Sequence, residues 1–407
     1  MRVREAQSMR TKHPIRVAYF TPEFKASQDH VFRSQVIGQA TALQLHGFEC
    51  MIIAADLDEC GCHQVQTMSS LQKLRVCMFS DYPRRPSALS LLKLAQVVAR
   101  KALPKLKDWR PDAIYVRAFN CFRPALKLAR SVGARLIYDG RGLVAEEAAY
   151  KKGRRLLLNR YIAYRELECY RRADRLLCVS GPFKQWIAEH TSRSDVHVVP
   201  SCIDANEFTY RPEARRRIRR NLGWSEEAPV IVYCGSLSPW QCIGKVLSLM
   251  AQMKAIEENL KCLLLTTDPE QMQSLAIAAG LPGDSFHSLK AIRESIPDWL
   301  SAADVGVIIR QRSLVNKVAS PIKIAEYLGC GLGVICSEGL GDLSDQIRTS
   351  QVGVVLRDDE CAKAATAVEW LKRVCNDRQL RDRAQKLVAD YLVWSIHITT
   401  YRTVYCR

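Results

Sequence analysis

Short apolar segments alternate with longer helix-forming stretches along most of this chain, and this alternation constrains the fold more than any other feature. The first two segments are residues 15–20 (IRVAYF) and 50–55 (CMIIAA). Similar segments follow at residues 113–116, 135–138, 175–179 and 196–199. Short buried strands separated by helices are typical of a parallel sheet with helices on both faces, in which ligands bind at the carboxyl ends of the strands. The sequence therefore predicts an α/β protein with functional residues directly after its strands.

A second series of the same kind follows an irregular, polar stretch. Its apolar segments include residues 229–234, 261–266 and 333–336. Between the two series, Pro200 ends a strand-like segment and polar residues follow it, as expected for a hinge between domains. A chain of 407 residues can bury two separate cores. We therefore predict four parts. They are a basic leader (1–14), two α/β domains (15–204 and 205–390) and a C-terminal helix (391–407).

Composition and charge limit the classes of partner. With 48% hydrophobic and 25% charged residues the chain is globular, and no run of about 20 apolar residues could span a bilayer. The start, MRVREAQSMRTKHP, lacks the apolar core of a signal peptide, so we expect a cytoplasmic protein. The 16 cysteines are scattered and lack zinc-site spacing, which favours reduced thiols and no metal site.

The net charge of +18 concentrates in two segments. Residues 151–175 hold nine Lys or Arg against three acids, and residues 211–220 hold six Arg against one Glu. Anionic lipid, a phosphorylated substrate or a merely solvated basic face would each explain this charge. Nucleic acid is not expected, because no row of aromatic residues for base stacking accompanies the basic runs.

Residues 320–342 (SPIKIAEYLGCGLGVICSEGLGD) read as a helix, a strand and a loop. Ser320 can cap the helix and Pro321 suits its first position. Lys323 in the first turn opposes the helix dipole, unless an anion such as a phosphate docks beside the free amides. Glu326, one turn further, adds acceptors for hydroxyl groups, so the pattern favours a nucleotide. The alternative is an ordinary capped helix whose Lys323 and Glu326 form a weak surface pair.

This segment resembles the signature helix of the retaining glycosyltransferases of the group 1 or family 4 type. There the motif S-P-x-K-x-x-E-Y-L-x-x-G precedes an apolar strand and a G-x-G-D-like loop, all of which this sequence contains. The resemblance implies a GT-B architecture, with two Rossmann-like doubly wound domains facing a cleft and a last helix that crosses back to the first domain. It also implies transfer of a sugar, with retention, from a nucleoside-diphosphate sugar to a saccharide or lipid-linked saccharide. The expected setting is cell-surface polysaccharide or glycoconjugate synthesis.

The resemblance assigns the donor side of the cleft. Lys323, Arg310 and Glu326 are the predicted catalytic residues: the two cations stabilise the departing diphosphate and Glu326 holds the ribose diol, so no metal or other cofactor is required. The remaining predicted donor-binding residues are Gly235, Ser236, Gln241, Lys245, Leu289, Ser320, Pro321, Gly341 and Asp342.

The sequence departs from the family pattern at three donor positions. Ser236 and Gln241 stand where the family usually has Arg and Lys, and Val318 replaces the first of two glutamates. We expect Lys245, together with Arg310 and Lys323, to supply the missing positive charge. These departures keep open the alternative of a non-catalytic, basic binding protein of the same fold. A nucleotide-sugar isomerase of this fold is a further alternative, although no acid and base pair stands out for it.

The acceptor side is predicted from the first domain. Asp139 and Arg141 follow a strand within D-G-R-G and Glu146 lies just beyond, so the glycines allow close approach and the charged groups can bind hydroxyls. A pair between Asp139 and Arg141 that only fixes the turn is equally compatible. His30, in the loop predicted between the first strand and its helix at 31–46, is either an acceptor contact or merely solvated.

The basic helix predicted at residues 154–172 carries Leu157, Tyr161 and Tyr164 on one face. We expect this stripe to pack against the sheet. The alternative is peripheral contact with an anionic membrane, where lipid-linked acceptors would be found. In the second domain, Asp304 begins a strand and is expected to cap or pair rather than to bind substrate.

Overall fold

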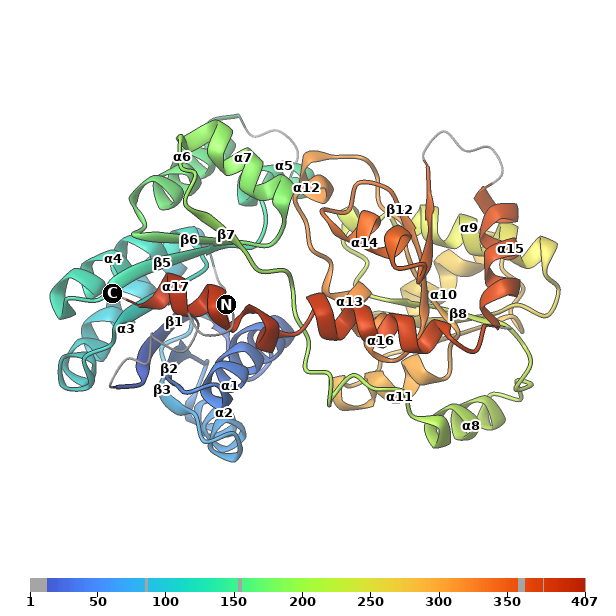
Figure 1. The fold of residues 1–407 in the computed structure, drawn as a ribbon, viewed down its shortest axis with the longest axis horizontal. Helices are drawn as coiled ribbons and strands as arrows, with labels where there is room; N and C mark the ends of the chain where they lie inside the picture. Colours follow the sequence, from blue (N-terminus) through green and yellow to red (C-terminus); the bar gives the residue numbers. More distant parts are fainter. Residues whose placement is uncertain (1–12, 85–86, 153–155, 358–362, 376, 407) are drawn as a thin grey trace, which may run out of the picture.

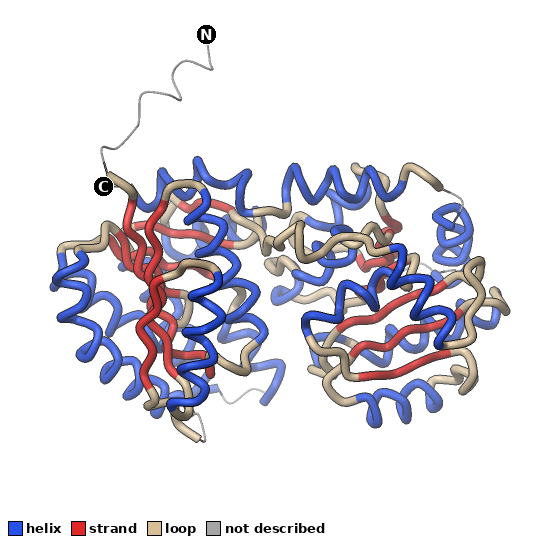
Figure 2. The backbone as a smooth tube through the Cα atoms, turned by 90° about the horizontal axis from the view of Figure 1, so that it is seen from below, coloured by secondary structure: helices blue, strands red, loops and turns tan. Residues whose placement is uncertain are grey.

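The computed structural model describes residues 13–84, 87–152, 156–357, 363–375 and 377–406, and it contains two α/β units side by side (Figure 1). The predicted leader, residues 1–14, lies almost wholly outside the described residues. Each unit has one parallel sheet with helices on both faces (Figure 2), which confirms the predicted fold class. Within the described residues no helix is long and apolar enough to cross a membrane.

The first unit contains a seven-stranded sheet in the order β3-β2-β1-β4-β5-β6-β7, with every neighbouring pair parallel. Its strands are β1 (Ile15–Lys25), β2 (Phe48–Ala55), β3 (Arg75–Phe79), β4 (Ala113–Val116), β5 (Arg135–Gly140), β6 (Arg175–Cys178) and β7 (Val196–Val198). The central strands are almost wholly buried, as expected for a sheet covered on both faces.

Helices pack on both faces of this sheet, and the two faces have separate apolar clusters. One face carries η2 (Phe32–Ile37), a π-helical turn, and α1 (Gly38–Leu45). The cluster on the other face receives side chains from α3 (Ala88–Trp109), α4 (Phe119–Val132) and α7 (Gly181–Thr191). The other helices of the unit are α2 (Glu59–Leu71), α5 (Val144–Lys152) and α6 (Leu156–Arg172).

The second unit contains a six-stranded parallel sheet in the order β10-β9-β8-β11-β12-β13. Its strands are β8 (Val230–Cys234), β9 (Lys261–Leu265), β10 (Phe286–Leu289), β11 (Val305–Ile308), β12 (Gly333–Ser337) and β13 (Gly353–Leu356). Its helices are α8 (Pro212–Asn221), η3 (Pro239–Gln241), α9 (Ile243–Ile256), α10 (Pro269–Ala278), η4 (Arg293–Ser295), α11 (Ile296–Ser301), α12 (Leu314–Lys317), α13 (Ile322–Gly329), α14 (Leu343–Thr349), α15 (Lys363–Cys375) and α16 (Leu380–Tyr391). One large apolar cluster fills this unit.

The end of the chain returns to the first unit. After α16, the short helix η5 (Trp394–His397) leads into α17 (Ile398–Tyr405), which contacts β1 and β5 and lies among the elements of the first unit in Figure 1. Trp394, Tyr401 and Tyr405 are buried there, and the Tyr401 hydroxyl accepts a hydrogen bond from Gln39 at 2.9 Å. The apolar side chains of this segment thus tie the second unit to the first.

Two predictions about local structure were wrong. β1 does not end at Phe20 but continues to Lys25, because the backbone of the predicted loop pairs again with β2 after an irregularity. The stripe on α6 does not pack against the sheet: Leu157, Tyr161 and Tyr164 are 85%, 52% and 60% exposed. A different face of α6, with Cys169 and Tyr170, enters the core.

The basic run at residues 211–220 does not fit the alternative of a merely solvated face. Arg219 is fully buried, where it donates to the carbonyl oxygens of Ala302, Ser225, Glu226 and Ala228 and to the carboxylate of Asp304. Arg215 also pairs with Asp304, and Arg211 and Arg217 both pair with Asp298. Asp304 is therefore structural, as predicted. Most of the arginines of α8 and its N-cap hold this helix against the rest of the second unit.

Candidate functional site

Each sheet has one point where the strand order reverses, and these two points define the candidate site. In the first sheet the reversal lies between β1 and β4, and in the second between β8 and β11. Crevices at the carboxyl ends of the strands at such points are the usual ligand sites of open α/β sheets. Segments that follow strands in the two units meet directly: the Ser180 hydroxyl donates to the Val318 carbonyl at 2.8 Å, and the Gly181 amide donates to Asp342 at 2.8 Å. The two carboxyl edges therefore face each other.

The start of α13 differs from the prediction. Pro321 has extended backbone and is the N-cap residue, so the helix begins at Ile322 and not at Pro321. The Ser320 hydroxyl does not cap the helix, because it accepts a hydrogen bond from the Ser201 amide of the interdomain segment at 3.0 Å. The first-turn amides of α13 consequently have no side-chain cap.

Lys323 and Glu326 form a largely buried ion pair rather than a weak surface pair. The Nζ atom of Lys323 lies 2.5 Å from Oε2 of Glu326, and the two side chains are 27% and 2% exposed. Burial opposes the charge of Lys323, but the neighbouring acidic groups of Cys234 and Glu326 outweigh it and raise the pKa of the lysine. A permanent cation therefore lies one turn from a buried carboxylate at the carboxyl edge of the second sheet.

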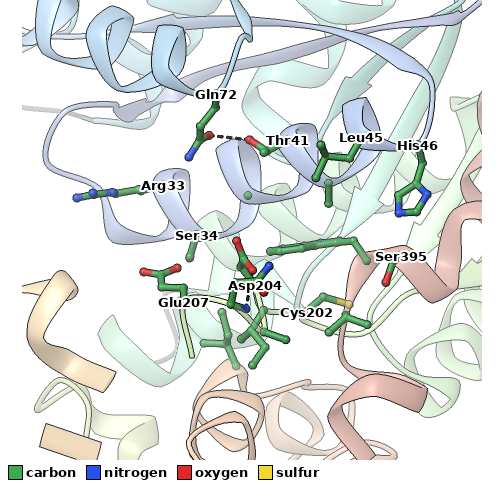
Figure 3. A pocket seen from close by; sticks show the side chains of 18 of the residues that line it. Arg33, Ser34, Thr41, Leu45, His46, Gln72, Cys202, Asp204, Glu207 and Ser395 are labelled. Carbon is green, nitrogen blue, oxygen red and sulfur yellow. Dashed lines mark hydrogen bonds between the residues drawn. The ribbon is translucent and has the colours of Figure 1, made fainter. Parts of the chain in front are cut away.

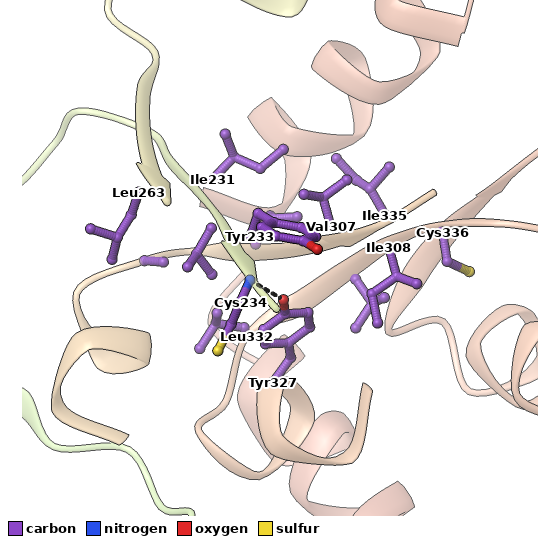
Figure 4. Packing of buried hydrophobic residues seen from close by; sticks show 14 of the residues in the cluster. Ile231, Tyr233, Cys234, Leu263, Val307, Ile308, Tyr327, Leu332, Ile335 and Cys336 are labelled. Carbon is purple, nitrogen blue, oxygen red and sulfur yellow. Dashed lines mark hydrogen bonds between the residues drawn. The ribbon is translucent and has the colours of Figure 1, made fainter. Parts of the chain in front are cut away.

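Tyr327 fixes α13 against β8. Its hydroxyl accepts a hydrogen bond from the Cys234 amide at 2.8 Å, as the dashed line in Figure 4 shows. The ring of Tyr327 lies over Gly306, where a Cβ atom would come within 2.1 Å of the ring. Gly306 is thus needed for this contact, which sets the distance between Lys323 and the loop after β8.

Arg310 follows β11 and shapes that loop. Its side chain is 8% exposed and donates to the Trp240 carbonyl in η3 at 2.5 Å, while its amide donates to the Ser337 hydroxyl at 2.9 Å. Burial lowers the pKa of Arg310. The structure therefore brings Arg310 next to the loop that contains Ser236 and Gln241, with the Ser236 hydroxyl bonded to Ser238 at 2.9 Å.

The remaining predicted donor residues lie around the same edge, although not all in one place. Gly341 has φ +52°, and a Cβ there would lie 2.1 Å from the Ala319 carbonyl, so close approach requires glycine. Asp342 bridges the units, since its carboxylate accepts from the Gly181 amide of the first unit and from the Tyr391 hydroxyl of α16 at 3.3 Å. Leu289 ends β10, and Lys245 is exposed on α9 beside a cavity of about 350 Å³.

On the opposite side, Asp139 and Arg141 pair with each other at 3.4 Å. Asp139 also accepts from the Tyr115 hydroxyl, and Arg141 donates to Gln35 at 3.0 Å and to Ser201 at 3.2 Å. Asp139 and Arg141 therefore do form the pair that would fix the turn. The other two predicted acceptor residues, His30 and Glu146, are exposed.

Sequence reasoning missed Glu23 and Arg117. Glu23 lies near the end of β1 and Arg117 directly follows β4, so they lie at the reversal point of the first sheet. In the described structure, a buried carboxylate oxygen of Glu23 and a buried guanidinium nitrogen of Arg117 have no hydrogen-bond partner. Both are charged residues at the carboxyl ends of adjacent strands, and this position could have identified them. Glu23 was overlooked because residues 21–30 were predicted to be a loop.

A cavity of about 560 Å³ lies between the units on the side where the chain crosses over (Figure 3). It is lined by η2 and α1 of the first unit, by the crossover residues 202–207 and by the returning segment at Trp394. Arg33, which lines it, pairs with Glu294 of the second unit at 2.5 Å. In the described part of the chain, no group of three or more His, Cys, Asp or Glu could hold a metal ion.

This architecture is that of the GT-B glycosyltransferases, and solved structures of that class superpose on most of the chain. A glycosyltransferase from Rickettsia africae ESF-5 has a TM-score of 0.70 at 12% identity and covers 97% of this chain and 98% of its own. Sucrose-phosphate synthase from Thermosynechococcus elongatus has a TM-score of 0.71 at 15% identity, with coverage of 97% and 98%. Anabaena HepE in complex with UDP has a TM-score of 0.68 at 15% identity, with coverage of 96% and 99%.

Two models of protein families match the two units of the chain. Residues 34–207 match Glycosyltransferase Family 4 and residues 214–387 match Glycosyl transferases group 1. The chain therefore belongs to the group 1 and family 4 glycosyltransferases, a family of enzymes. A D-inositol 3-phosphate glycosyltransferase of Geodermatophilus obscurus is 25% identical over 236 residues, which are 54% of this chain and 50% of that protein. The chain spans about half the length of the curated relatives it matches, including a second such enzyme of Catenulispora acidiphila, 24% identical over 226 residues.

Proposed function

We propose that this glycosyltransferase moves a sugar, with retention, from a nucleoside-diphosphate sugar to a saccharide or lipid-linked saccharide in cell-surface polysaccharide or glycoconjugate synthesis. The observation that carries the proposal is the buried pair of Lys323 and Glu326 beside the uncapped start of α13. A cation and free amides suit a diphosphate, and a carboxylate one turn away suits a ribose diol. The complex of HepE with UDP supports a uridine nucleotide as the first candidate donor.

The chemistry follows from where charge develops. Breaking the anomeric bond leaves negative charge on the diphosphate, so groups that already carry positive charge there lower the barrier. Lys323, Arg310 and the backbone amides around Gly341 are suited to this role. With these groups in place the reaction requires neither a metal nor another cofactor. The anomeric configuration is retained if the acceptor hydroxyl attacks from the face that the phosphate leaves and gives its proton to that phosphate. This route needs no enzymic nucleophile.

Calorimetric titration of the full chain with UDP, GDP, ADP and their common sugar conjugates tests the donor site. One nucleotide series should bind, and at a hundred times its Kd it should also stabilise the protein by about 2.7 kcal/mol. Glu326→Ala and Lys323→Ala should each weaken binding at least tenfold. Lys386→Ala is the matched control, because Lys386 and Asp390 form an exposed pair on α16 at 2.6 Å. Absence of binding by every nucleotide at millimolar concentration would refute the proposal.

We also propose that the enzyme works at the cytoplasmic face of an anionic membrane, through the exposed face of α6. Leu157, Leu158, Tyr161 and Tyr164 are 42–85% exposed there, and Arg160 beside them is also exposed. Apolar and aromatic side chains flanked by cations bind the headgroup region of anionic bilayers. Flotation with phosphatidylglycerol vesicles should recover the natural chain, whereas Leu157→Ser with Tyr161→Ser, or phosphatidylcholine vesicles alone, should not. Equal flotation of natural chain and double variant would contradict this location.

A further inference from the structure

Three adjacent strands of the first sheet end in charged side chains with unsatisfied polar atoms. β1, β4 and β5 are neighbours in the sheet, and Glu23, Arg117 and Asp139 lie at or near their carboxyl ends. Oε1 of Glu23, Nη1 of Arg117 and Oδ1 of Asp139 are all buried without a hydrogen-bond partner. Buried polar groups in native proteins are normally bonded, so three unpartnered atoms on consecutive strands call for a common explanation.

The other atoms of these side chains are held in place. Oε2 of Glu23 accepts from the Cys121 thiol at 3.6 Å, and the guanidinium of Arg117 lies 5.7 Å from the centre of the Phe24 ring. Oδ2 of Asp139 accepts from Tyr115 and Arg141. Glu23 and Arg117 are each half-buried, whereas Asp139 is 2% exposed, so a ligand at the open edge of the sheet meets Glu23 and Arg117 first.

The set of donors and acceptors defines the ligand. Two carboxylate oxygens need a hydrogen-bond donor and one guanidinium nitrogen needs an acceptor. A hydroxyl group supplies both, so neighbouring hydroxyls of one sugar ring or cyclic polyol satisfy all three side chains. A phosphate dianion has acceptors only, so it would leave the two carboxylate oxygens without a donor, and Asp29 adds negative charge close to Glu23.

We propose that Glu23, Arg117 and Asp139 form an acceptor subsite for the neutral, hydroxyl-bearing face of a sugar or cyclic polyol. The subsite rests on the proposed transferase function, since it supplies the acceptor for the donor bound across the cleft. It does not extend to a phosphate of the acceptor, which must bind elsewhere if the acceptor has one. Burial raises the pKa of Glu23 to about 7, against the lowering effects of a backbone hydrogen bond, Arg117 and the Cys121 thiol.

Saturation-transfer NMR on the full chain with UDP present, and repeated with GDP and ADP, tests the subsite. The probes are the methyl glycosides of glucose, galactose, mannose and N-acetylglucosamine, together with myo-inositol and glucose 6-phosphate. At least one neutral probe should bind. Glu23→Gln and Arg117→Gln should each weaken that binding at least tenfold without changing the nucleotide Kd, which also shows that the variants are folded.

Matched controls are Glu189→Gln on α7 and Arg130→Gln on α4, which change the same residue types at exposed positions of the same unit. Neither should alter probe binding. The inference is overturned if nucleotide binds but no neutral probe does, if both site variants bind the probe as the natural chain does, or if glucose 6-phosphate binds more tightly than the neutral glucoside. If no nucleotide binds, the proposed function itself fails, so the two failures are distinguishable.

Discussion

Removing Lys323 should destabilise the protein far more than removing a surface lysine. Glu326 is 2% exposed and its partner at 2.5 Å is Lys323. Lys323→Met would leave this carboxylate buried without its cation, and breaking a buried pair typically costs about 3–5 kcal/mol. Because the Lys323 side chain is 27% exposed, water can partly replace it, and we expect the lower end, about 3 kcal/mol.

Urea unfolding of a double-mutant cycle measures this quantity. The double variant Lys323→Met with Glu326→Gln removes both charges, so it should regain most of the stability that Lys323→Met loses, which appears as a coupling free energy above about 1.5 kcal/mol. Lys386→Met, which breaks an exposed pair on α16, should leave the unfolding free energy nearly unchanged. If Lys323→Met costs less than about 1 kcal/mol, or if the cycle shows no coupling, the pair behaves as a surface pair and our reasoning is wrong.

Three further predictions concern buried charge. Burial raises the pKa of Glu23 from 4.5 to about 7, so ionisation of this carboxyl destabilises the folded state, fully above pH 7 and progressively less as the pH falls through 4.5. Urea unfolding should therefore find Glu23→Gln more stable than the natural chain by up to about 3 kcal/mol at pH 8, by less than about 1 kcal/mol at pH 5, and equal to it at about pH 4. Arg219→Met leaves four carbonyl groups without this donor and removes one of the two arginines that pair with Asp304, so its unfolding free energy should fall by at least about 3 kcal/mol. Val318→Glu restores the family glutamate but buries it in an apolar cluster, so the midpoint of urea unfolding should fall by the equivalent of about 3 kcal/mol or more at pH 7.

Each of these has a clear contrary result. A stability difference for Glu23→Gln that is independent of pH between 5 and 8 would show that the carboxyl of Glu23 does not titrate in that range. A loss below about 1 kcal/mol for Arg219→Met would mean that water replaces the guanidinium despite its complete burial. A Val318→Glu protein of natural stability would mean that residue 318 faces the solvent of the cleft and not the core.

The fold was largely predictable because parallel strands and their helices leave strong local patterns. The predicted segment 113–116 coincides with β4, and the predicted segment 50–55 differs from β2 by two residues at its start. Burial on both faces requires continuous apolar sequence, which makes such strands easy to find. The end of β1 was missed because residues 21–25 (TPEFK) are polar enough to read as loop, and backbone pairing with β2 overrode that composition. The orientation of α6 was missed for a related reason. Its exposed stripe is apolar, while charged residues such as Arg165 and Glu166 are buried, so the apolar period pointed to the wrong face.

The candidate site was less predictable, because pairing between distant residues decides it. The sequence brought Lys323 and Glu326 onto one helix face, but only the structure shows that Glu326 is buried. It could not indicate that the Ser320 hydroxyl bonds to Ser201, 119 positions away. For the same reason Asp139 was correctly singled out as a strand-end acid, while the unpartnered atom that makes it of interest emerged only from the complete set of hydrogen bonds.

Val318 shows how one departure from the family pattern can be structural and functional together. Its side chain is fully buried within an apolar cluster of the first unit, although it directly follows α12 of the second unit. Its carbonyl accepts from the Ser180 hydroxyl. A glutamate here could contact a donor only by leaving that cluster. The apolar residue therefore favours contact between the units, and in the proposed function the donor is bound by Lys323, Arg310 and Glu326 instead. For this reason the Lys323 and Glu326 variants, more than any change at residue 318, test whether the cleft binds a nucleotide sugar.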